Sequence, residues 1–191
     1  VYKRQTPKLP LILLIHGLGG CADSTYMLQT AGYFLGRGYS VLRLNLRGVK
    51  PAQAPSRHYY HAGRDQDLES VLKELNAMQF IPNGVIVIGF SLGGNILLKF
   101  LGGFGTDYPI RAALSVSAPI DLATTSERVL QPRNYLYHKW LLYHMKKGML
   151  GLKDLNDRQR KTILYTNTVF EFDDRVTAPE NGFSGAVDYY K

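Results

Sequence analysis

The chain has 191 residues, of which 45% are apolar and 20% are charged, and its formal net charge is +8. This composition is typical of a soluble globular protein with one domain and one sizeable core. The single cysteine, Cys21, excludes an internal disulfide, and the longest apolar runs, such as Leu11–Ile15, are too short to span a membrane.

The first 120 residues show hydrophobic patterns that alternate between strand and helix. Strands are expected at residues 11–15, 39–46, 85–88 and 111–117. Helices are expected at residues 26–35, 68–78 and 95–101. Because helices of this length separate the strands, the sequence predicts an α/β fold, with a parallel sheet and helices on both faces.

From Asp121 onward the alternation stops, and the remaining sequence is helical, basic and aromatic, with no strong strand. Residues 128–161 hold nine lysines and arginines against two aspartates, together with Trp140 and several tyrosines. Such a segment is typical of a solvated helical hairpin or of a surface that meets an anionic membrane. It carries no nucleic-acid-binding motif, so no nucleic-acid partner is expected.

The pentapeptide Gly89-Phe90-Ser91-Leu92-Gly93 has the form G-x-S-x-G and stands between an expected strand and an expected helix. That context is typical of a nucleophile elbow, in which a sharp turn exposes a serine hydroxyl above a sheet. Gly89 and Gly93 lack a Cβ, which lets the strand and the helix approach closely. Ser91 is therefore the candidate nucleophile.

The loop after the first strand reads His16-Gly17-Leu18-Gly19-Gly20. Acyl transfer creates an oxyanion that needs preorganised N–H donors. The expected donors are the backbone N–H groups of Leu18, in this loop, and of Leu92, which follows the nucleophile. A tight βα turn without such a role is the alternative for the loop, and His16 is expected to be structural.

Other chemistries have weaker support. The glycines match neither a phosphate-binding loop nor a dinucleotide-binding fingerprint, and no cofactor is expected. His58 and His61 are three residues apart, but no further ligands stand at metal-site spacing, so we expect histidines that hydrogen-bond locally and no metal.

Several motifs together resemble the YheT-like branch of the α/β-hydrolases. They are His16-Gly17-Leu18-x-Gly20, Asn45-Leu46-Arg47-Gly48, Gly89-Phe90-Ser91-Leu92-Gly93-Gly94-Asn95, Val116-Ser117-Ala118-Pro119-Ile120-Asp121-Leu122 and Glu171-Phe172-Asp173-Asp174. The resemblance implies a serine hydrolase of carboxylic esters, such as short- to medium-chain esters or monoacylglycerol-type lipids. An acyltransferase that makes esters from the same acyl-enzyme and a non-catalytic binding module are the alternatives. The compartment stays open between the cytoplasm and a membrane surface.

The resemblance also implies a division of the chain. It assigns residues 6–120 to a partial hydrolase core, 121–181 to a helical lid and 182–191 to the return to the core. Residues 1–5 are interpreted as a non-native scar, and the chain as a fragment truncated at both ends. The final strands, with the triad aspartate and histidine, are then expected after Lys191, and the fragment alone is expected to be inactive.

Residues of the lid offer an alternative triad. Asp121 follows the fourth expected strand, and His138 and His144 come later, which satisfies the chain order of a hydrolase triad. We expect instead that Asp121 caps the first lid helix, because both histidines lie in helical sequence. Asp173 and Asp174 are expected to be structural. The apolar residues of the lid are expected either to line the acyl chain or to pack the lid: Trp140, Leu141, Leu142 and Met145.

Overall fold

The computed structural model describes residues 9–49 and 58–191, and the chain forms two compact units. The first, called the sheet unit, comprises Val1–Leu46 and Ala62–Ala118. The second, called the helical unit, comprises Arg47–His61 and Pro119–Lys191. Each unit is considered by itself.

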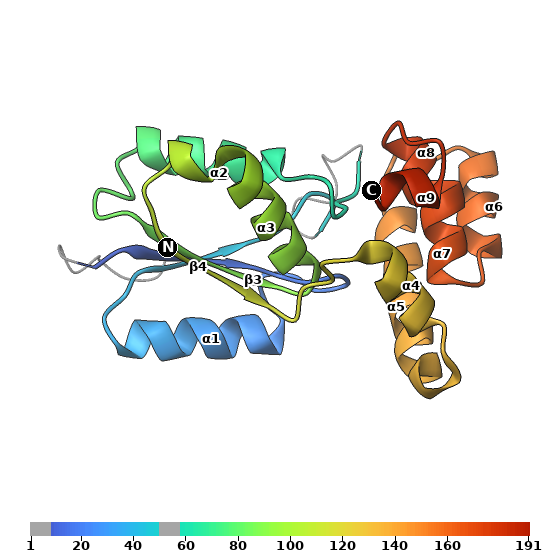
Figure 1. Cartoon of the computed structure of the whole chain (residues 1–191), viewed down its shortest axis with the longest axis horizontal. Coiled ribbons are helices and arrows are strands. Elements are labelled where there is room, and N and C mark those ends of the chain that lie inside the picture. Colours follow the sequence, from blue (N-terminus) through green and yellow to red (C-terminus); the bar gives the residue numbers. More distant parts are fainter. Residues whose placement is uncertain (1–8, 50–57) are drawn as a thin grey trace. The chain divides into compact units, whose positions relative to one another are not determined.

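The described sheet unit contains a four-stranded parallel sheet with the strand order β2-β1-β3-β4 (Figure 1). The strands are β1 (Leu11–Ile15), β2 (Val41–Leu44), β3 (Val85–Phe90) and β4 (Ile110–Val116). All five residues of β1 are buried, so the prediction of a strand covered on both faces is confirmed. Residues 111–116 of β4, which forms one edge of this sheet, are exposed.

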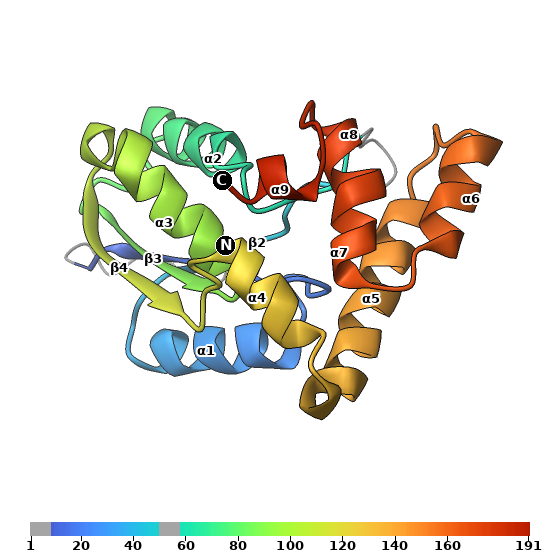
Figure 2. The same ribbon diagram turned by 45° about the vertical axis from the view of Figure 1, so that its right-hand side comes forward.

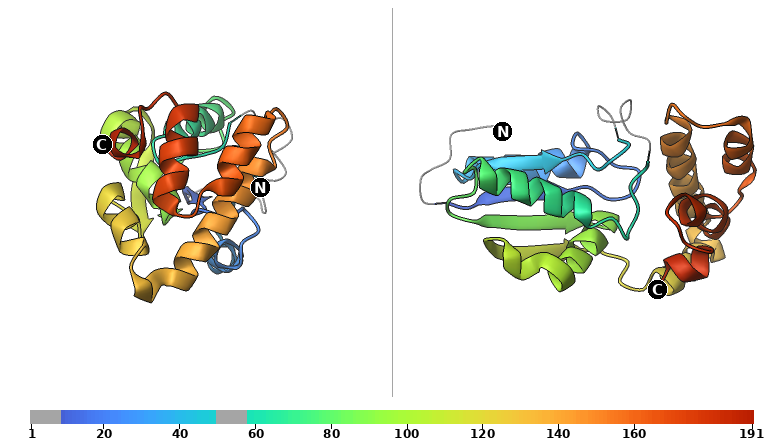
Figure 3. Two further views of the ribbon diagram at one scale, coloured as in Figure 1. Left: turned by 90° about the vertical axis from the view of Figure 1, so that its right-hand side faces the viewer. Right: turned by 90° about the horizontal axis from the view of Figure 1, so that it is seen from above.

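Helices cover both faces of the sheet, as predicted. They are α1 (Thr25–Gly36), α2 (Gln66–Ala77) and α3 (Leu92–Phe104), followed by the short 3-10 helix η1 (Gly105–Asp107). Helix α1 lies on one face, and α2 and α3 lie on the other (Figures 1 and 3). On the α1 side, Ile12 and Leu14 of β1 pack with Met27 and Ala31. The helices therefore bury the sheet from both sides, and the carboxyl ends of its parallel strands lie together at one edge.

Several boundaries differ from the prediction by a few residues, and two of them lie beside the candidate nucleophile or its neighbouring loop. Strand β2 ends at Leu44 and not at residue 46, because the Leu46 N–H donates to the His16 ring and the Asn45 side chain accepts the Ala22 N–H. Helix α3 begins at Leu92, three residues earlier than expected, so it starts directly after Ser91. The first difference comes from contacts between distant residues, and the second from backbone bonds of the Ser91 carbonyl to Gly94 and Asn95; hydrophobic periodicity records neither.

The helical unit contains no strand within its described residues. Its helices are α4 (Leu122–Val129), η2 (Pro132–Asn134), α5 (Tyr135–Leu150), α6 (Asp157–Tyr165), α7 (Val169–Phe172), the π-helix η3 (Asp173–Thr177), α8 (Ala178–Glu180) and α9 (Ala186–Tyr189). Helix α5 is the longest, and α6 and α7 pack beside it (Figure 2). No helix within residues 9–49 and 58–191 has the length and apolarity needed to cross a bilayer.

Side chains cap helices α4 and α6 of this unit. The Asp121 carboxylate accepts the Thr124 N–H at 2.8 Å, which confirms the predicted cap of α4. Helix α6 begins with a capping box, in which Asn156 and Gln159 each accept the other's backbone N–H. Local sequence therefore determines where both helices begin.

Candidate active site

Ser91 occupies the turn between β3 and α3 in an unusual backbone conformation. Its φ is 50° and its ψ is −121°, a region that costs a non-glycine residue about 1–3 kcal/mol. Hydrogen bonds hold the turn: the Ser91 N–H donates to the Val116 carbonyl at 2.8 Å, and the Ser91 carbonyl accepts the Gly94 N–H at 2.8 Å and the Asn95 N–H at 3.1 Å. The strained serine is thus fixed both to the neighbouring strand and to the first turn of α3.

The glycines around Ser91 are sites of close backbone approach. A Cβ on Gly93 would lie 2.5 Å from the His16 carbonyl oxygen and 2.7 Å from that of Ile15, and a Cβ on Gly89 would overlap the Gly93 carbonyl. Gly94 was not singled out from the sequence, yet a Cβ there would lie 2.7 Å from the Ser115 hydroxyl oxygen. Helix α3 therefore crosses β1, β3 and β4 at distances that exclude side chains at these positions.

The loop after β1 lies directly against the serine. A Cβ on Gly17 would lie 2.9 Å from the Ser91 Cβ and 3.5 Å from its Oγ. The Gly20 N–H donates to the Gly17 carbonyl at 3.1 Å and closes the turn. This loop is therefore both the tight turn that the sequence indicates and a neighbour of Ser91.

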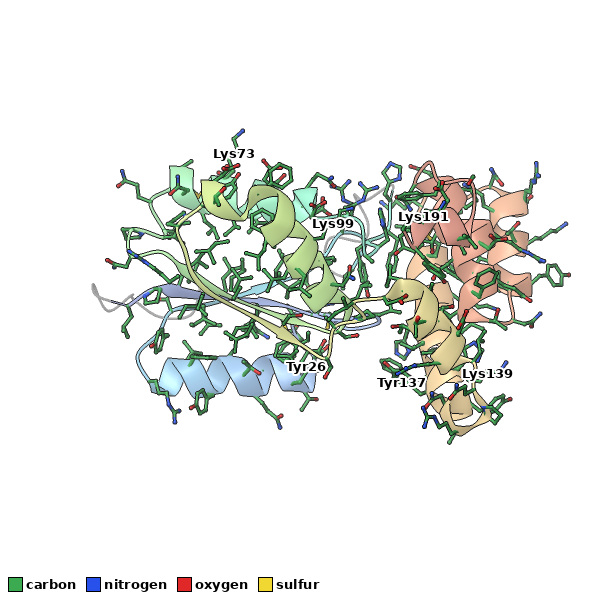
Figure 4. All side chains as sticks on the ribbon, viewed as in Figure 1. Tyr26, Lys73, Lys99, Tyr137, Lys139 and Lys191 are labelled. Carbon is green, nitrogen blue, oxygen red and sulfur yellow. The ribbon has the colours of Figure 1, made fainter. Side chains whose placement is uncertain are left out.

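Tyr26 holds the same loop, a role that the sequence analysis missed. Its hydroxyl accepts the Gly17 N–H at 3.0 Å, and its ring packs edge-on against Phe90, with 5.0 Å between the ring centroids. Figure 4 shows Tyr26 at the start of α1. The spacing of Tyr26 from Gly17 indicates no such contact, because the turn that joins them depends on where α1 packs.

His16 is buried and its ring joins two segments. The Leu46 N–H donates to Nε2 at 3.1 Å, so Nε2 is unprotonated and Nδ1 donates to the Gly17 carbonyl at 2.8 Å. Burial lowers the pKa of the His16 imidazole, while the bond to Gly17 acts in the opposite direction. With both nitrogens engaged, the neutral ring stabilises the loop and is not placed to accept a proton from Ser91.

The two expected oxyanion donors flank this arrangement. Leu92 is the first residue of α3, where a backbone N–H has no partner within the helix. Leu18 follows Gly17, which lies against Ser91. Within the described part of the chain neither N–H donates a hydrogen bond. Both are therefore available to a ligand atom bound at Ser91.

The α/β-hydrolase fold family matches residues 10–143, which is most of the chain. The chain belongs to this family. The putative esterase YheT of Escherichia coli is 29% identical to it over 98% of the chain and 56% of that protein, which confirms the resemblance to the YheT-like branch. The mouse phospholipase ABHD3 is 28% identical over 95% of the chain and 44% of that protein. The chain thus spans about half the length of these curated relatives.

Solved structures agree with the α/β-hydrolase fold. The Pyrococcus furiosus esterase Pf2001 superposes with a TM-score of 0.57 at 22% identity, over 80% of this chain and 56% of that one. Est1E from Butyrivibrio proteoclasticus, with ferulic acid bound, gives a TM-score of 0.51 at 17% identity, over 63% of this chain and 47% of that one. At these identities the structures support the fold alone.

The alternative triad that an α/β-hydrolase chain order allows is not supported by the contacts of its members. Hydrogen bonds from the Thr124 hydroxyl and N–H hold the Asp121 carboxylate and lower its pKa. The His138 Nε2 accepts the Val169 N–H at 3.1 Å, and burial lowers the pKa of this imidazole. His144 Nδ1 bonds to the Trp140 carbonyl at 2.8 Å. These groups stabilise helices of the helical unit.

The late aspartates have structural contacts, in agreement with expectation. Asp173 is buried and accepts the Tyr190 hydroxyl at 2.8 Å, and Asp174 accepts the Ala186 N–H at 2.9 Å. Burial raises the pKa of Asp173 to about 6. The π-helix η3 is thereby tied to the last residues of the chain.

His61 and the apolar lid residues have these positions in the structure. His61 packs edge-on against Tyr189 at 5.6 Å between ring centroids, and the residues of known placement contain no group of three metal-ligating side chains. Leu141, Leu142 and Met145 are buried in the helical unit, whereas Trp140 is 46% exposed. Of these four apolar lid residues, Leu141, Leu142 and Met145 therefore pack the lid, and Trp140 is exposed.

Proposed function

We propose that Ser91 is the nucleophile of a serine ester hydrolase that acts on carboxylic esters through an acyl-enzyme. The observation that carries this proposal is the strained Ser91 at the β3–α3 turn, with Gly17 against its side chain. A backbone strained by about 1–3 kcal/mol persists where function depends on it. The relatives are named as a putative esterase, a phospholipase and a monoacylglycerol lipase, and these names support the same general chemistry.

In the proposed reaction the Ser91 Oγ attacks the ester carbonyl carbon and gives its proton to a base. The carbonyl oxygen becomes an oxyanion, to which the Leu18 and Leu92 N–H groups donate. Collapse of this intermediate expels the alcohol and leaves the acyl group on Ser91. Water then attacks the acyl carbon and releases the acid. The Nε2 atoms of His16 and His138 each accept a backbone N–H, so we propose that the base and its acid come from outside these residues, after Lys191.

We further propose that residues 121–181 act as a lid over short- to medium-chain esters or monoacylglycerol-type lipids. A lid shields an acyl-enzyme from water and supplies apolar surface for the acyl chain. A yeast monoacylglycerol lipase is 26% identical to the whole chain, over 46% of that protein. The exposed Trp140 is the first candidate for contact with the acyl chain.

Transfer of the acyl group to an alcohol is the second candidate. The yeast medium-chain fatty acid ethyl ester synthase/esterase 2 is 25% identical over 96% of the chain and 46% of that protein. The name of this yeast protein includes both ester synthesis and ester hydrolysis. The two reactions share an acyl-enzyme and differ in whether an alcohol or water accepts the acyl group. Product analysis with ethanol added to the assay separates the two: ethyl ester formation in preference to hydrolysis would favour the transferase.

Labelling with a fluorophosphonate probe tests the nucleophile. The full-length protein is expected to be labelled and the Ser91→Ala variant is not. Ser117→Ala is the matched control, because Ser117 also has a positive φ, 52°, and follows the next strand of the sheet. It precedes Ala118 and Pro119, with no helix N-terminus behind it. Persistent labelling of Ser91→Ala, or its loss in Ser117→Ala alone, would reject Ser91.

A further inference from the structure

Helices α6 and η3 pack against each other and form an open pocket in the helical unit. Its lining consists of Arg158, Lys161, Thr162 and Tyr165 from α6, and Arg175 from η3. The four α6 residues have the spacing i, i+3, i+4 and i+7, which places them on one face of the helix. The tertiary structure adds Arg175, which the basic segment at residues 128–161 does not include.

Three of the five lining residues are cations, and the pocket contains no acid. Among residues 9–49 and 58–191, neither Arg158, Lys161 nor Arg175 forms an ion pair. All three side chains are exposed. Their positive charges therefore converge on one pocket without a compensating carboxylate in the described chain.

Three acidic residues of the helical unit have hydrogen-bond partners outside the pocket lining. Glu180 accepts the Gln159 side-chain amide at 2.6 Å, and Asp174 accepts the Ala186 N–H at 2.9 Å. Glu171 accepts the Asn167 N–H at 2.7 Å. None of these three carboxylates lines the pocket.

We propose that this pocket binds a phosphate monoester. Such a group carries about −1.5 to −2 charges at pH 7 and has three acceptor oxygens, which match three converging cations better than a single carboxylate does. The two guanidinium groups provide planar pairs of donors for phosphate oxygens, and the Lys161 ammonium adds a point charge. The Thr162 hydroxyl donates to the Arg158 carbonyl at 3.0 Å, so the cations, and not this hydroxyl, are the proposed donors to the phosphate.

The pocket is open, so the phosphate can belong to a soluble metabolite or to the headgroup of a lipid. Binding does not depend on ester hydrolysis, and the test uses the Ser91→Ala protein so that no substrate is consumed. Calorimetric titration with glycerol 3-phosphate, with acetate as the comparison anion, measures the soluble arm. Co-sedimentation with phosphatidylcholine vesicles that contain phosphatidic acid or phosphatidylglycerol measures the lipid arm, at about 150 mM salt to screen long-range attraction.

Two triple variants of equal net charge provide the comparison. The pocket variant carries Arg158→Gln, Lys161→Gln and Arg175→Gln. The control variant carries Arg133→Gln, Lys153→Gln and Lys191→Gln, three exposed cations of the same unit outside both the pocket and helix α5. We expect saturable binding of glycerol 3-phosphate that weakens by about tenfold or more in the pocket variant and stays unchanged in the control.

A preference for phosphatidic acid over phosphatidylglycerol that only the pocket variant loses would assign the site to a lipid headgroup. Glycerol 3-phosphate binding without that preference would assign it to a soluble phosphate. Equal loss in both triple variants would show an effect of bulk charge and overturn the proposal. Acetate binding as tight as that of glycerol 3-phosphate, or no saturation by glycerol 3-phosphate, would overturn it too.

Discussion

Gly17 and Ser91 lie so close that residue 17 has no room for a side chain: a Cβ there would come within 2.9 Å of the Ser91 Cβ and 3.1 Å of the Phe90 carbonyl oxygen. The neighbours are a backbone oxygen and the strained residue itself, and neither can move without disturbing the elbow. The loop after β1 and the nucleophile turn are therefore one steric assembly, although 74 residues separate them in the sequence.

The Gly17→Ala variant tests this relationship. We expect kcat/KM for a short ester to fall by about a hundredfold in the full-length protein, since misplacing a catalytic group by about 1 Å has that effect. Gly32→Ala is the control, because a Cβ at residue 32 of α1 meets nothing within 4 Å. That variant is expected to keep full activity. An active Gly17→Ala enzyme would show that the loop is not part of the site.

The oxyanion donors give a second prediction. Leu18→Pro removes the backbone N–H, whereas Leu18→Ala removes only the side chain. We expect kcat to fall by about 10²–10³ in Leu18→Pro with KM little changed, and we expect Leu18→Ala to stay within a few-fold of the native rate. Thermal unfolding of each variant checks that the loop still folds. Equal activity of the two variants would show that the Leu18 N–H does not stabilise the oxyanion.

The buried Asp173 predicts a pH dependence of stability. Burial raises the pKa of this carboxyl to about 6 in the folded chain, whereas the ordinary pKa of an aspartate, 3.8, applies when the chain is unfolded. The folded state therefore binds more protons between these values, and the free energy of unfolding falls as the pH rises from about 4 to 6. The loss amounts to about 3 kcal/mol at most.

Urea unfolding at pH 4.5, 5.5 and 7.5 measures this loss. Asp173→Asn keeps an oxygen that can accept the Tyr190 hydroxyl but cannot ionise, so its unfolding free energy should change less over this range than that of the native chain. Asp188 and the other surface carboxylates are the same in both proteins. The difference between the two pH profiles of the unfolding free energy therefore isolates the ionisation of Asp173. Parallel pH profiles of the two proteins would contradict the prediction.

The 191-residue chain alone is expected to hydrolyse p-nitrophenyl esters at no more than a residual rate. Ser91 needs a base, yet His16 and His138 each accept a backbone N–H through Nε2. Residual turnover that survives His138→Ala and His144→Ala would come from binding and the oxyanion hole. Native-like turnover that either substitution abolishes would restore the lid-histidine triad.

The aromatic and basic surface of α5 is expected to bind anionic vesicles. Tyr135, Tyr137, Trp140 and Tyr143 are exposed there, and Lys139 and Lys147 lie over the Tyr135 and Tyr143 rings, respectively. Aromatic rings and cations together suit the interface of an anionic bilayer.

Co-sedimentation should therefore be stronger with phosphatidylserine vesicles than with neutral ones and should weaken with salt. Trp140→Ala should weaken binding to both kinds of vesicle, while Tyr33→Ala, at an exposed ring of α1, should not. Equal binding to charged and neutral vesicles would contradict the prediction and would show that the positive charge serves solubility only. Tight binding to DNA with a steep salt dependence would replace lipid by nucleic acid as the partner.

The order and type of the elements followed from the sequence, because they depend on local patterns. An apolar run at Leu11–Ile15, helical spacing in α2 and the glycines around Ser91 are each readable within a few residues. The elbow was therefore recognisable, and so was the cap at Asp121, where a carboxylate three residues before an N–H suffices.

Contacts between distant segments were decided by the tertiary structure alone. Periodicity carries no information on strand order, so the β2-β1-β3-β4 arrangement had to come from packing. The same holds for the Tyr26 hydroxyl at Gly17, the Leu46 N–H at His16, and Arg175 beside the cations of α6. Each depends on how two elements pack in three dimensions, and the free energy that selects this packing is a sum over many buried contacts, which no short stretch of sequence contains.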